Sequence, residues 1–401
     1  MKYLFVIGNL FLASIACWYI YVRAFTPLIA ILAKYTSEKT LKVIFKVLAL
    51  LLALSSSAYF ISMYYDSHLL SMATAYLMGI LMVIFFPLFG FELSLLIARE
   101  LRRRLQRTQS QEMSVIIKIL ATLWIVLGLI YASGSFYQGA KFPTVKKLTI
   151  PIKNLPYNEM KVVLLTDLHI GPFLKRDFVE RLVAAVNELR PDAIFIVGDI
   201  LDLNPTRSNS IANDLAPLGD LKARFGSFMV LGNHELYVGA NEVVPFLRSL
   251  SPTLPLLINE SVQIGEAGKK LNVVGLSEYA AKRFYIHYPE LLPSLEKSKK
   301  GYIPGLPTIM LSHQPVQVKL LDPKEKPALD ADLMLSGHTH GGQVFPFQLS
   351  IYFKQDRMLS GLYRYKKGNT SVYISEGAGF WGPPLRFFSS SEISLITLVP
   401  Q

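Results

Sequence analysis

The 401-residue sequence has only one cysteine, Cys17, which lies in an apolar segment near the amino terminus. No intramolecular disulfide can form, so cysteine usage does not identify the redox compartment. A structural zinc site is disfavoured as well, because such sites are built largely on cysteine thiolates.

A concentrated basic stripe is also missing. The net charge of +12 comes from 41 Lys and Arg against 29 Asp and Glu, and both halves of the chain are only mildly basic. A nucleic-acid partner is therefore not expected, since such proteins gather basic charge on one face. Charged residues are scarce inside the apolar runs, which disfavours a pump or channel. No protein partner can be inferred.

Hydrophobic residues make up 51% of the chain and are concentrated before residue 142. Four apolar runs have about the length needed to span hydrocarbon. They are Tyr3–Tyr21, Val43–Tyr64, Leu69–Ala98 and Val115–Ser135. The first run lacks a small-residue cleavage site, so a retained helix is expected rather than a signal peptide. We predict a four-helix transmembrane region over residues 1–138, a linker and entry strand over 139–159, and a separate domain over 160–401.

Basic residues in the short loops predict the orientation in the membrane. The loops after the first and third runs contain Arg23, Lys34, Lys39, Lys42, Arg99, Arg102, Arg103, Arg104 and Arg107. The loop around His68 contains no Lys or Arg. Residues 160–401 are therefore expected outside the cytoplasm. Glu92, toward the end of the third run, is expected near the headgroups or paired with a basic neighbour rather than in a relay.

Beyond residue 141, short apolar runs alternate with polar connections that contain Gly and Pro. The expected strands are Lys161–Leu165, Ala193–Val197, Ser227–Leu231, Leu271–Val274, Pro307–Leu311, Leu333–Leu335, Ser371–Ile374 and Ile393–Leu398. Asp177–Leu189 has helical spacing and ends before Pro191. This rhythm predicts a layered α/β domain. Residues 203–216 and 321–331 are expected as surface loops.

Polar side chains follow five of these strands, at the carboxyl ends where open α/β sheets place their sites. The candidate metal ligands are Asp167, His169, Asp199, Asn233, His313, His338 and His340. Carboxylate, imidazole and amide oxygen together suit Mn, Fe or Zn. Two such ions bridged by one carboxylate activate a hydroxide at neutral pH, and a phosphoester is its natural target.

The motifs Asp167-x-His169, Gly198-Asp199, Gly232-Asn233-His234-Glu235, His313 and Gly337-His338-Thr339-His340 resemble the signature of calcineurin-like metallophosphoesterases. The resemblance implies a layered α/β-sandwich metallophosphoesterase catalytic domain over residues 160–401 that uses two divalent metal ions. It implies a first ion held by Asp167, His169, Asp199 and His340, and a second held by Asp199, Asn233, His313 and His338. Asp199 would bridge the two ions and take part in catalysis.

The resemblance also implies roles for residues around the ions. His234 would contact the phosphate, and would stabilise the transition state or protonate the leaving oxygen. Glu235 stands where this family more often has Asp, and is expected to orient His234. Asp202 is expected as a turn or capping residue. Arg386 is expected either to bind an acidic headgroup or to form a structural salt bridge.

Features near the carboxyl terminus resemble the YkuE- and YaeI-like membrane-associated branch of the family. They are Gly341-Gly342-Gln343, Ser375-Glu376-Gly377-Ala378-Gly379 and Pro383-Pro384-Leu385-Arg386. Enzymes that cleave UDP-diacylglucosamine also belong to this branch, so a pyrophosphatase of lipid A synthesis is an alternative. The localisation expected from the resemblance is the bacterial inner membrane.

Two aromatic segments, residues 345–353 and 379–388, flank the motifs. They favour contact with the lipid bilayer and a lipid-linked or membrane-proximal phosphate substrate, because aromatic side chains prefer the membrane interface. Packing on the core is the other interpretation, and soluble phosphomonoesters or nucleotides remain alternative substrates. A noncatalytic membrane receptor or scaffold on the same fold would be expected to lack ligands, and none is missing here.

Overall fold

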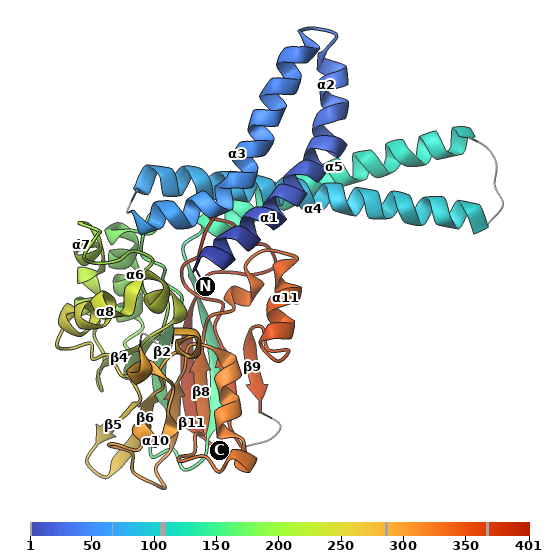
Figure 1. Ribbon diagram of the computed structural model, residues 1–401. Coiled ribbons are helices and arrows are strands. Elements are labelled where there is room, and N and C mark those ends of the chain that lie inside the picture. Colours follow the sequence, from blue (N-terminus) through green and yellow to red (C-terminus); the bar gives the residue numbers. More distant parts are fainter. Residues whose placement is uncertain (1, 66, 105–109, 285–287, 366–368) are drawn as a thin grey trace. The chain divides into compact units, whose positions relative to one another are not determined.

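The computed structural model describes residues 2–65, 67–104, 110–284, 288–365 and 369–401 (Figure 1). Arg107, one of the residues used to predict orientation, lies outside these ranges. The chain divides into two units, Met1–Tyr137 with Gly382–Leu385 and Gln138–Trp381 with Arg386–Gln401.

Long helices make up most of the first unit. They are α1 (Lys2–Ile20), a π-helical turn (Tyr21–Phe25), α2 (Thr26–Leu32), α3 (Glu38–Tyr64), α4 (His68–Arg104) and α5 (Ser110–Ala140). Among the described residues, three helical segments have the length and composition to cross a membrane: Leu10–Leu32, His68–Arg104 and Met113–Ala140. The expected run Val43–Tyr64 lies in α3, which is not one of these three. A fourth span therefore stays a prediction.

The first apolar segment extends farther than expected. It continues through the π-helical turn and α2 to Leu32 rather than ending at Tyr21, so Arg23 lies inside a helical segment and not in a loop. The helix continues because Pro27 falls at the start of α2, where the missing N–H of proline costs little.

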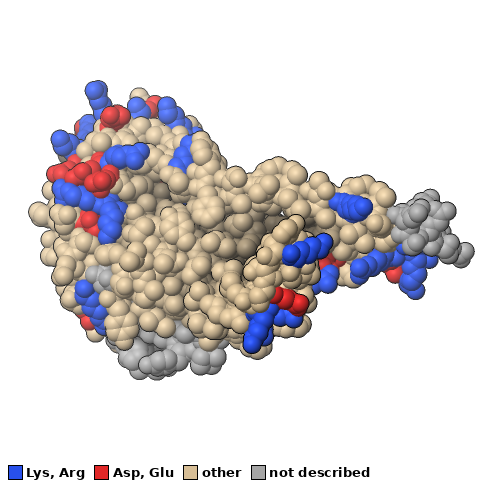
Figure 2. Space-filling view, turned by 90° about the horizontal axis from the view of Figure 1, so that it is seen from above, with Lys and Arg blue, Asp and Glu red and all other residues tan. Residues whose placement is uncertain are grey.

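Arg23 has an acidic partner on another helix of this unit. Its Nε lies 2.7 Å from Oε1 of Glu92 in α4, so Glu92 pairs with a basic residue, one of the two expected arrangements. In Figure 2 most of the helical surface is tan, and its charged side chains gather in a few places. Basic residues mark the end of α4, whose last turn contains Arg102, Arg103 and Arg104.

The second unit is built on two mixed β-sheets. One has the order β1-β11-β2-β3-β4, formed by Thr144–Ile152, Glu392–Pro400, Met160–Leu165, Ala193–Val197 and Ser227–Val230. The other has the order β5-β6-β7-β8-β10-β9, formed by Glu260–Glu266, Lys269–Gly275, Thr308–Leu311, Leu333–Ser336, Ser371–Ile374 and Gly361–Arg364. β11 pairs in parallel with β1 and antiparallel to β2.

Alternating side chains on the strands build the layers. Val162 and Leu164 of β2 pack into the core shared with residues of the second sheet, including Leu333 and Tyr373. Val163 and Leu165 face the opposite side, where α6 (Arg176–Glu188) and α8 (Asn233–Leu250) supply apolar residues. The two-residue period of a strand produces this division. A separate core lies on the other face of the second sheet, so the expected layered α/β architecture is present.

All eight expected strands form, and Ala193–Val197 and Ser371–Ile374 have the expected bounds. β5 and β9 have no counterpart among the expected strands. Both are edge strands, and one face of each is partly solvated, so their sequences lack a continuous apolar run.

Two loop expectations were wrong. Residues 203–216 contain α7 (Ile211–Leu215), in which Ile211 and Leu215 are fully buried. Leu329, within residues 321–331, is buried as well. Each segment contributes apolar side chains to a core, which a surface loop would not do. Within residues 345–353, the short helix α11 (Phe347–Lys354) forms.

Candidate metal centre

The seven candidate ligands converge at the carboxyl ends of five strands. Asp167 and His169 follow β2, Asp199 follows β3, and Asn233 follows β4. His313 follows β7, and His338 and His340 follow β8. The backbone at five of them has positive φ, namely Asp167, His169, Asp199, His338 and His340. Such conformations cost free energy in non-glycine residues and cluster at functional sites.

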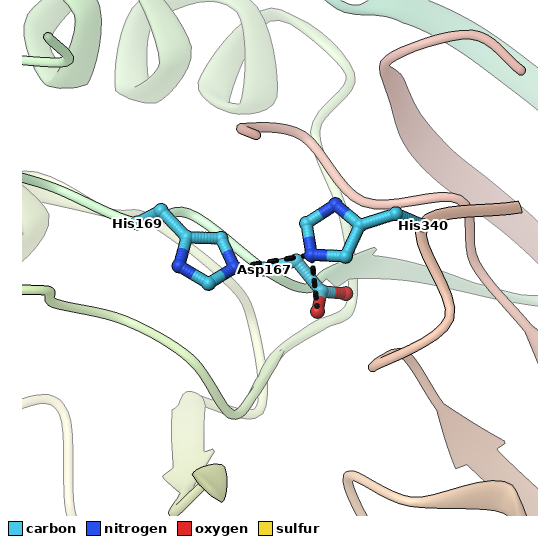
Figure 3. A group of neighbouring side chains, drawn as sticks. All are labelled: Asp167, His169 and His340. Atoms are coloured by element: carbon cyan, nitrogen blue, oxygen red, sulfur yellow. Dashed lines mark hydrogen bonds and ion pairs between the residues drawn. The ribbon is translucent and has the colours of Figure 1, made fainter. Parts of the chain in front are cut away.

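Asp167, His169 and His340 form a first group of possible ligands (Figure 3). Nε2 of His340 lies 3.3 Å from Oδ1 of Asp167 and 3.1 Å from Nε2 of His169. All three side chains are buried, and their ligand atoms lie within 4.8 Å of one another. One ion placed among these atoms could bind all three.

Asp199, His313 and His338 form a second group. Oδ2 of Asp199 lies 3.1 Å from Nε2 of His313 and 3.8 Å from Nε2 of His169. Asp199 therefore faces ligands of both groups, the position that a bridging carboxylate requires.

Two buried polar atoms favour a bound cation at the second group. Oδ1 of Asn233 finds no hydrogen-bond partner among the residues that the structure describes, and Nε2 of His313 faces the carboxylate of Asp199 at 3.1 Å. Nδ1 of His313 lies 2.9 Å from the carbonyl oxygen of Val197 and donates a hydrogen bond to it, so Nε2 is the atom that faces the ligand group. Unpaired buried polar groups are costly, so the donor set fits a divalent metal ion.

Burial lowers the pKa of both histidines of the glycine-flanked pair. The pKa of His338 falls to about 3. Burial also lowers the pKa of His340 well below the ordinary value, with the neighbouring His169 and Arg386 adding to the effect. Both rings are therefore neutral near pH 7, the form that binds a metal.

Asp202 lies between two histidines of the site. Its Oδ1 accepts a hydrogen bond from Nδ1 of His169 at 2.8 Å and another from Nδ1 of His234 at 2.6 Å. The expectation of a turn or capping residue was wrong, because the loop after β3 turns this carboxylate back into the site. The one indication in the sequence was its place three residues after Asp199.

The carboxylates around His234 determine its charge. Burial alone would lower its pKa, but Asp199 and Asp202 outweigh that effect and raise it to about 9. The side chain of His234 is 17% exposed, so it is less enclosed than His169, whose side chain is fully buried. At neutral pH His234 is a cation able to donate a proton.

Glu235 does not orient His234, contrary to expectation. Its carboxylate accepts hydrogen bonds from the backbone N–H groups of Gly232, Asp199, Ile200 and Leu201 at 2.6 to 3.2 Å. Asp202 binds His234 instead. Glu235 thus fixes the backbone of the loop that carries Asp199. Its side chain is longer than that of Asp, which allows its carboxylate to reach the N–H groups of that loop.

Arg386 meets neither expectation. Its side chain is fully buried, which excludes contact with a headgroup at the surface, and it forms no ion pair with any residue that the structure describes. Its guanidinium donates to backbone carbonyl oxygens instead, including Gly379 at 2.6 Å. Burial lowers its pKa to about 10, so it remains a cation.

Glycine is required where strand ends meet. A Cβ atom on Gly232 would lie 2.2 Å from both the backbone nitrogen and Oδ1 of Asp199. One on Gly337 would lie 2.3 Å from Oδ2 of Asp167. Any larger residue would therefore displace a candidate ligand.

Comparison with known proteins agrees with this geometry. Residues 160–342 match the family model for calcineurin-like phosphoesterases. A metallophosphoesterase of Helicobacter pylori is 40% identical over 66% of this chain and 66% of its own length. A Danio rerio protein described as a transmembrane protein with metallophosphoesterase domain is 32% identical over 83% of this chain and 74% of its own. The Bacillus subtilis metallophosphoesterase YkuE is 27% identical over 64% and 83%.

The chain belongs to the calcineurin-like metallophosphoesterases, a family of metal-dependent phosphoester hydrolases. The three apolar helical segments among its described residues, together with its transmembrane relatives, indicate association with a membrane.

Proposed function

We propose that this protein is a membrane-anchored phosphoesterase that uses two divalent metal ions and acts on a lipid-linked or membrane-proximal substrate. The observation that carries the proposal is that Asp199 faces ligands of two neighbouring groups. Asp167, His169, Asp199 and His340 would hold one ion, and Asp199, Asn233, His313 and His338 the other. Mn, Fe or Zn fits these ligands.

The bound ions would supply Lewis acidity and a water-derived nucleophile. The chain itself contributes a proton donor, His234, that is held in place by Asp202. Asp202 accepts a hydrogen bond from Nδ1–H of His234 and holds the ring at the edge of the ligand groups. Protonated His234 can then transfer a proton to the leaving oxygen when the phosphoester bond breaks.

Asp199→Asn and His234→Ala variants test this mechanism in the full chain. Asp199→Asn should lose both bound metal and hydrolysis of a soluble aryl phosphoester. His234→Ala should keep its metal but lose about 10²- to 10⁴-fold in kcat, the usual contribution of a general acid. Wild-type rates in both variants would rule the mechanism out.

An exposed apolar surface supports a lipid substrate. We define the aromatic patch as Phe345, Phe347, Leu349, Phe353 and Phe388, which are 41% to 78% exposed. Nε2 of Gln348 donates to the carbonyl oxygen of Phe387 at 2.9 Å, which ties α11 to the segment that carries Phe388. The patch begins five residues after the candidate ligand His340. An apolar surface of this kind beside a site favours binding of an apolar group.

The lipid proposal is tested with two substrates. Phe347→Ser/Phe353→Ser should hydrolyse a soluble aryl phosphoester at the wild-type rate, yet cleave a lipid-linked phosphate in vesicles at least about tenfold more slowly, the loss from about 1.4 kcal/mol of binding. Ile303→Ser, at a residue 44% exposed elsewhere, is the matched control. Equal loss on both substrates would count against lipid contact. Comparing the rates of hydrolysis of a lipid pyrophosphate and a lipid phosphomonoester would show which of the two bond types the protein cleaves.

The membrane is proposed to be a bacterial inner membrane crossed by four helices, with the site outside the cytoplasm. The basic residues in the last turn of α4 support this orientation. A reporter fused after Gln401 tests it, because alkaline phosphatase is active only outside the cytoplasm and a fluorescent protein folds well inside it.

A further inference from the structure

Among the described residues, Arg386 is the largest residue whose side chain is fully buried. A cation in this position loses its hydration and needs compensation from polar groups. Nη2 donates to the carbonyl oxygens of Glu376 at 2.8 Å and Gly379 at 2.6 Å. Nη1 donates to the carbonyl oxygen of His340 at 3.3 Å. The guanidinium therefore joins two separate backbone segments.

The first of these segments, residues 376–379, is bound to the loop that carries Asp167. The backbone N–H of Ala378 donates to the carbonyl oxygen of Thr166, and that of Gly379 donates to the carbonyl oxygen of Asp167, each at 2.9 Å. A Cβ atom added at Gly377 would lie 2.9 Å from Cβ of Asp167. Movement of this segment would therefore move Asp167.

The second segment contains the other ligand directly. Arg386 contacts the carbonyl oxygen of His340, and Nη2 lies 3.4 Å from Nδ1 of the same residue. Asp167 and His340 belong to one ligand group. One side chain therefore links the backbones of two ligands that come from different strands, β2 and β8.

The second ligand group meets the first at His338, whose backbone N–H donates to the carboxylate of Asp167 at 3.0 and 3.1 Å. Its other two members, Asp199 and His313, have supports of their own. Glu235 binds the backbone N–H groups at Asp199 and the two following residues. His313 is oriented by the carbonyl oxygen of Val197. None of these contacts involves Arg386 or residues 376–379.

We propose that Arg386 is a positioning residue for the first metal ion, the one assigned to Asp167, His169 and His340, and not for the second. The inference rests on the proposed two-metal function. Its planar fork of donors reaches both backbone segments at once, which a lysine ammonium, a single point of charge, does less well.

Metal stoichiometry of the purified full-length protein in detergent tests this assignment. Manganese titration of the wild type should show two ions per chain. Arg386→Met should keep one affinity unchanged and weaken the other about 10- to 100-fold, as other outer-shell changes do. In Arg386→Lys, the affinity of the weakened site should lie between those of the wild type and Arg386→Met. In electron paramagnetic resonance, Arg386→Met should replace the spin-coupled manganese pair by the spectrum of a single ion.

Two variants serve as controls. His313→Ala should show the complementary loss, of the second ion, and Arg224→Met at an exposed arginine should bind both ions normally. Equal weakening of both sites in Arg386→Met and Arg386→Lys, or two wild-type affinities, would overturn the assignment. If Arg386→Met does not fold, Arg386→Lys alone decides by the same comparison. Fewer than two ions in the wild type would instead refute the proposed function, and this inference with it.

Discussion

Two acidic residues of the site have exchanged the roles that their positions in the sequence suggest. Glu235, next to His234, binds backbone N–H groups around Asp199. Asp202, which is 32 residues from His234, accepts a hydrogen bond from the ring of His234. Adjacency in the chain is a poor guide here, because His234 and Glu235 start α8 and successive helical side chains point in different directions.

Asp202→Asn should lower kcat by about 10²-fold or more, because His234 loses the anion that orients it. The alkaline limb of the pH–rate profile should move to lower pH, since a neutral neighbour no longer raises the pKa of His234. Rates measured between about pH 6 and about pH 10 check both effects. Asp330→Asn, at an exposed acid, should change neither, and an unshifted alkaline limb in Asp202→Asn would refute the role.

The candidate ligands could be located from the sequence because each follows a recognisable apolar strand. Asp167, Asp199 and His313 lie directly beyond strands whose bounds were nearly correct. The environment of Arg386 could not be predicted, since its partners are backbone carbonyls of a segment seven to ten residues earlier and of His340. Backbone partners leave no trace in residue identity.

At the level of elements, the connections after the strands do more than link them to helices. The turn between β4 and α8 brings Gly232 against the backbone of Asp199, the residue that follows the neighbouring strand β3. Close approach of this kind is possible only without a side chain. The spacing of the two candidate ligands Asp199 and Asn233 therefore depends on a residue that binds no metal itself.

Gly232→Ala should abolish binding of at least one metal ion, because the new methyl group overlaps the backbone nitrogen and Oδ1 of Asp199. Overpacking of this sort also costs about 1–3 kcal/mol of stability. Gly219→Ala is the matched control, since its Cβ would make ordinary contacts at 3.4 Å. Metal content and thermal unfolding measure the two effects, and normal metal content in Gly232→Ala would contradict the packing argument.

Edge elements were the least predictable part of the fold. β5 and β9 have partners on one side only, so they need fewer apolar residues than central strands do. The short helix α7 was missed for a different reason. Its two buried apolar residues, Ile211 and Leu215, are four positions apart, and a single pair at helical spacing is too short a pattern to recognise in a polar stretch.

For the whole molecule, metal binding and protonation are coupled through His313. Burial alone would lower the pKa of His313, but Asp199, in contact with it, raises that pKa well above the ordinary value. His313 is therefore protonated near neutral pH in the metal-free protein, and it must lose that proton to act as a ligand.

Metal affinity should consequently rise with pH, and binding at pH 7 should release roughly one proton from His313. Calorimetry in two buffers of different ionisation enthalpy measures the release. His313→Gln should remove this proton while leaving the first ligand group intact. Affinity that is constant between about pH 6 and about pH 9 would contradict the coupling.

The position of β11 has a consequence for biosynthesis. Residues 392–400 form the strand between β1 and β2, so β1 has no neighbour in its sheet until those residues leave the ribosome. The apolar helices before residue 138 emerge first and can enter a bilayer while the domain behind them is still incomplete. The apolar helices should therefore reach the membrane before the first sheet is complete, and a chain stalled on the ribosome before residue 392 should lack the pairing of β1 with β11.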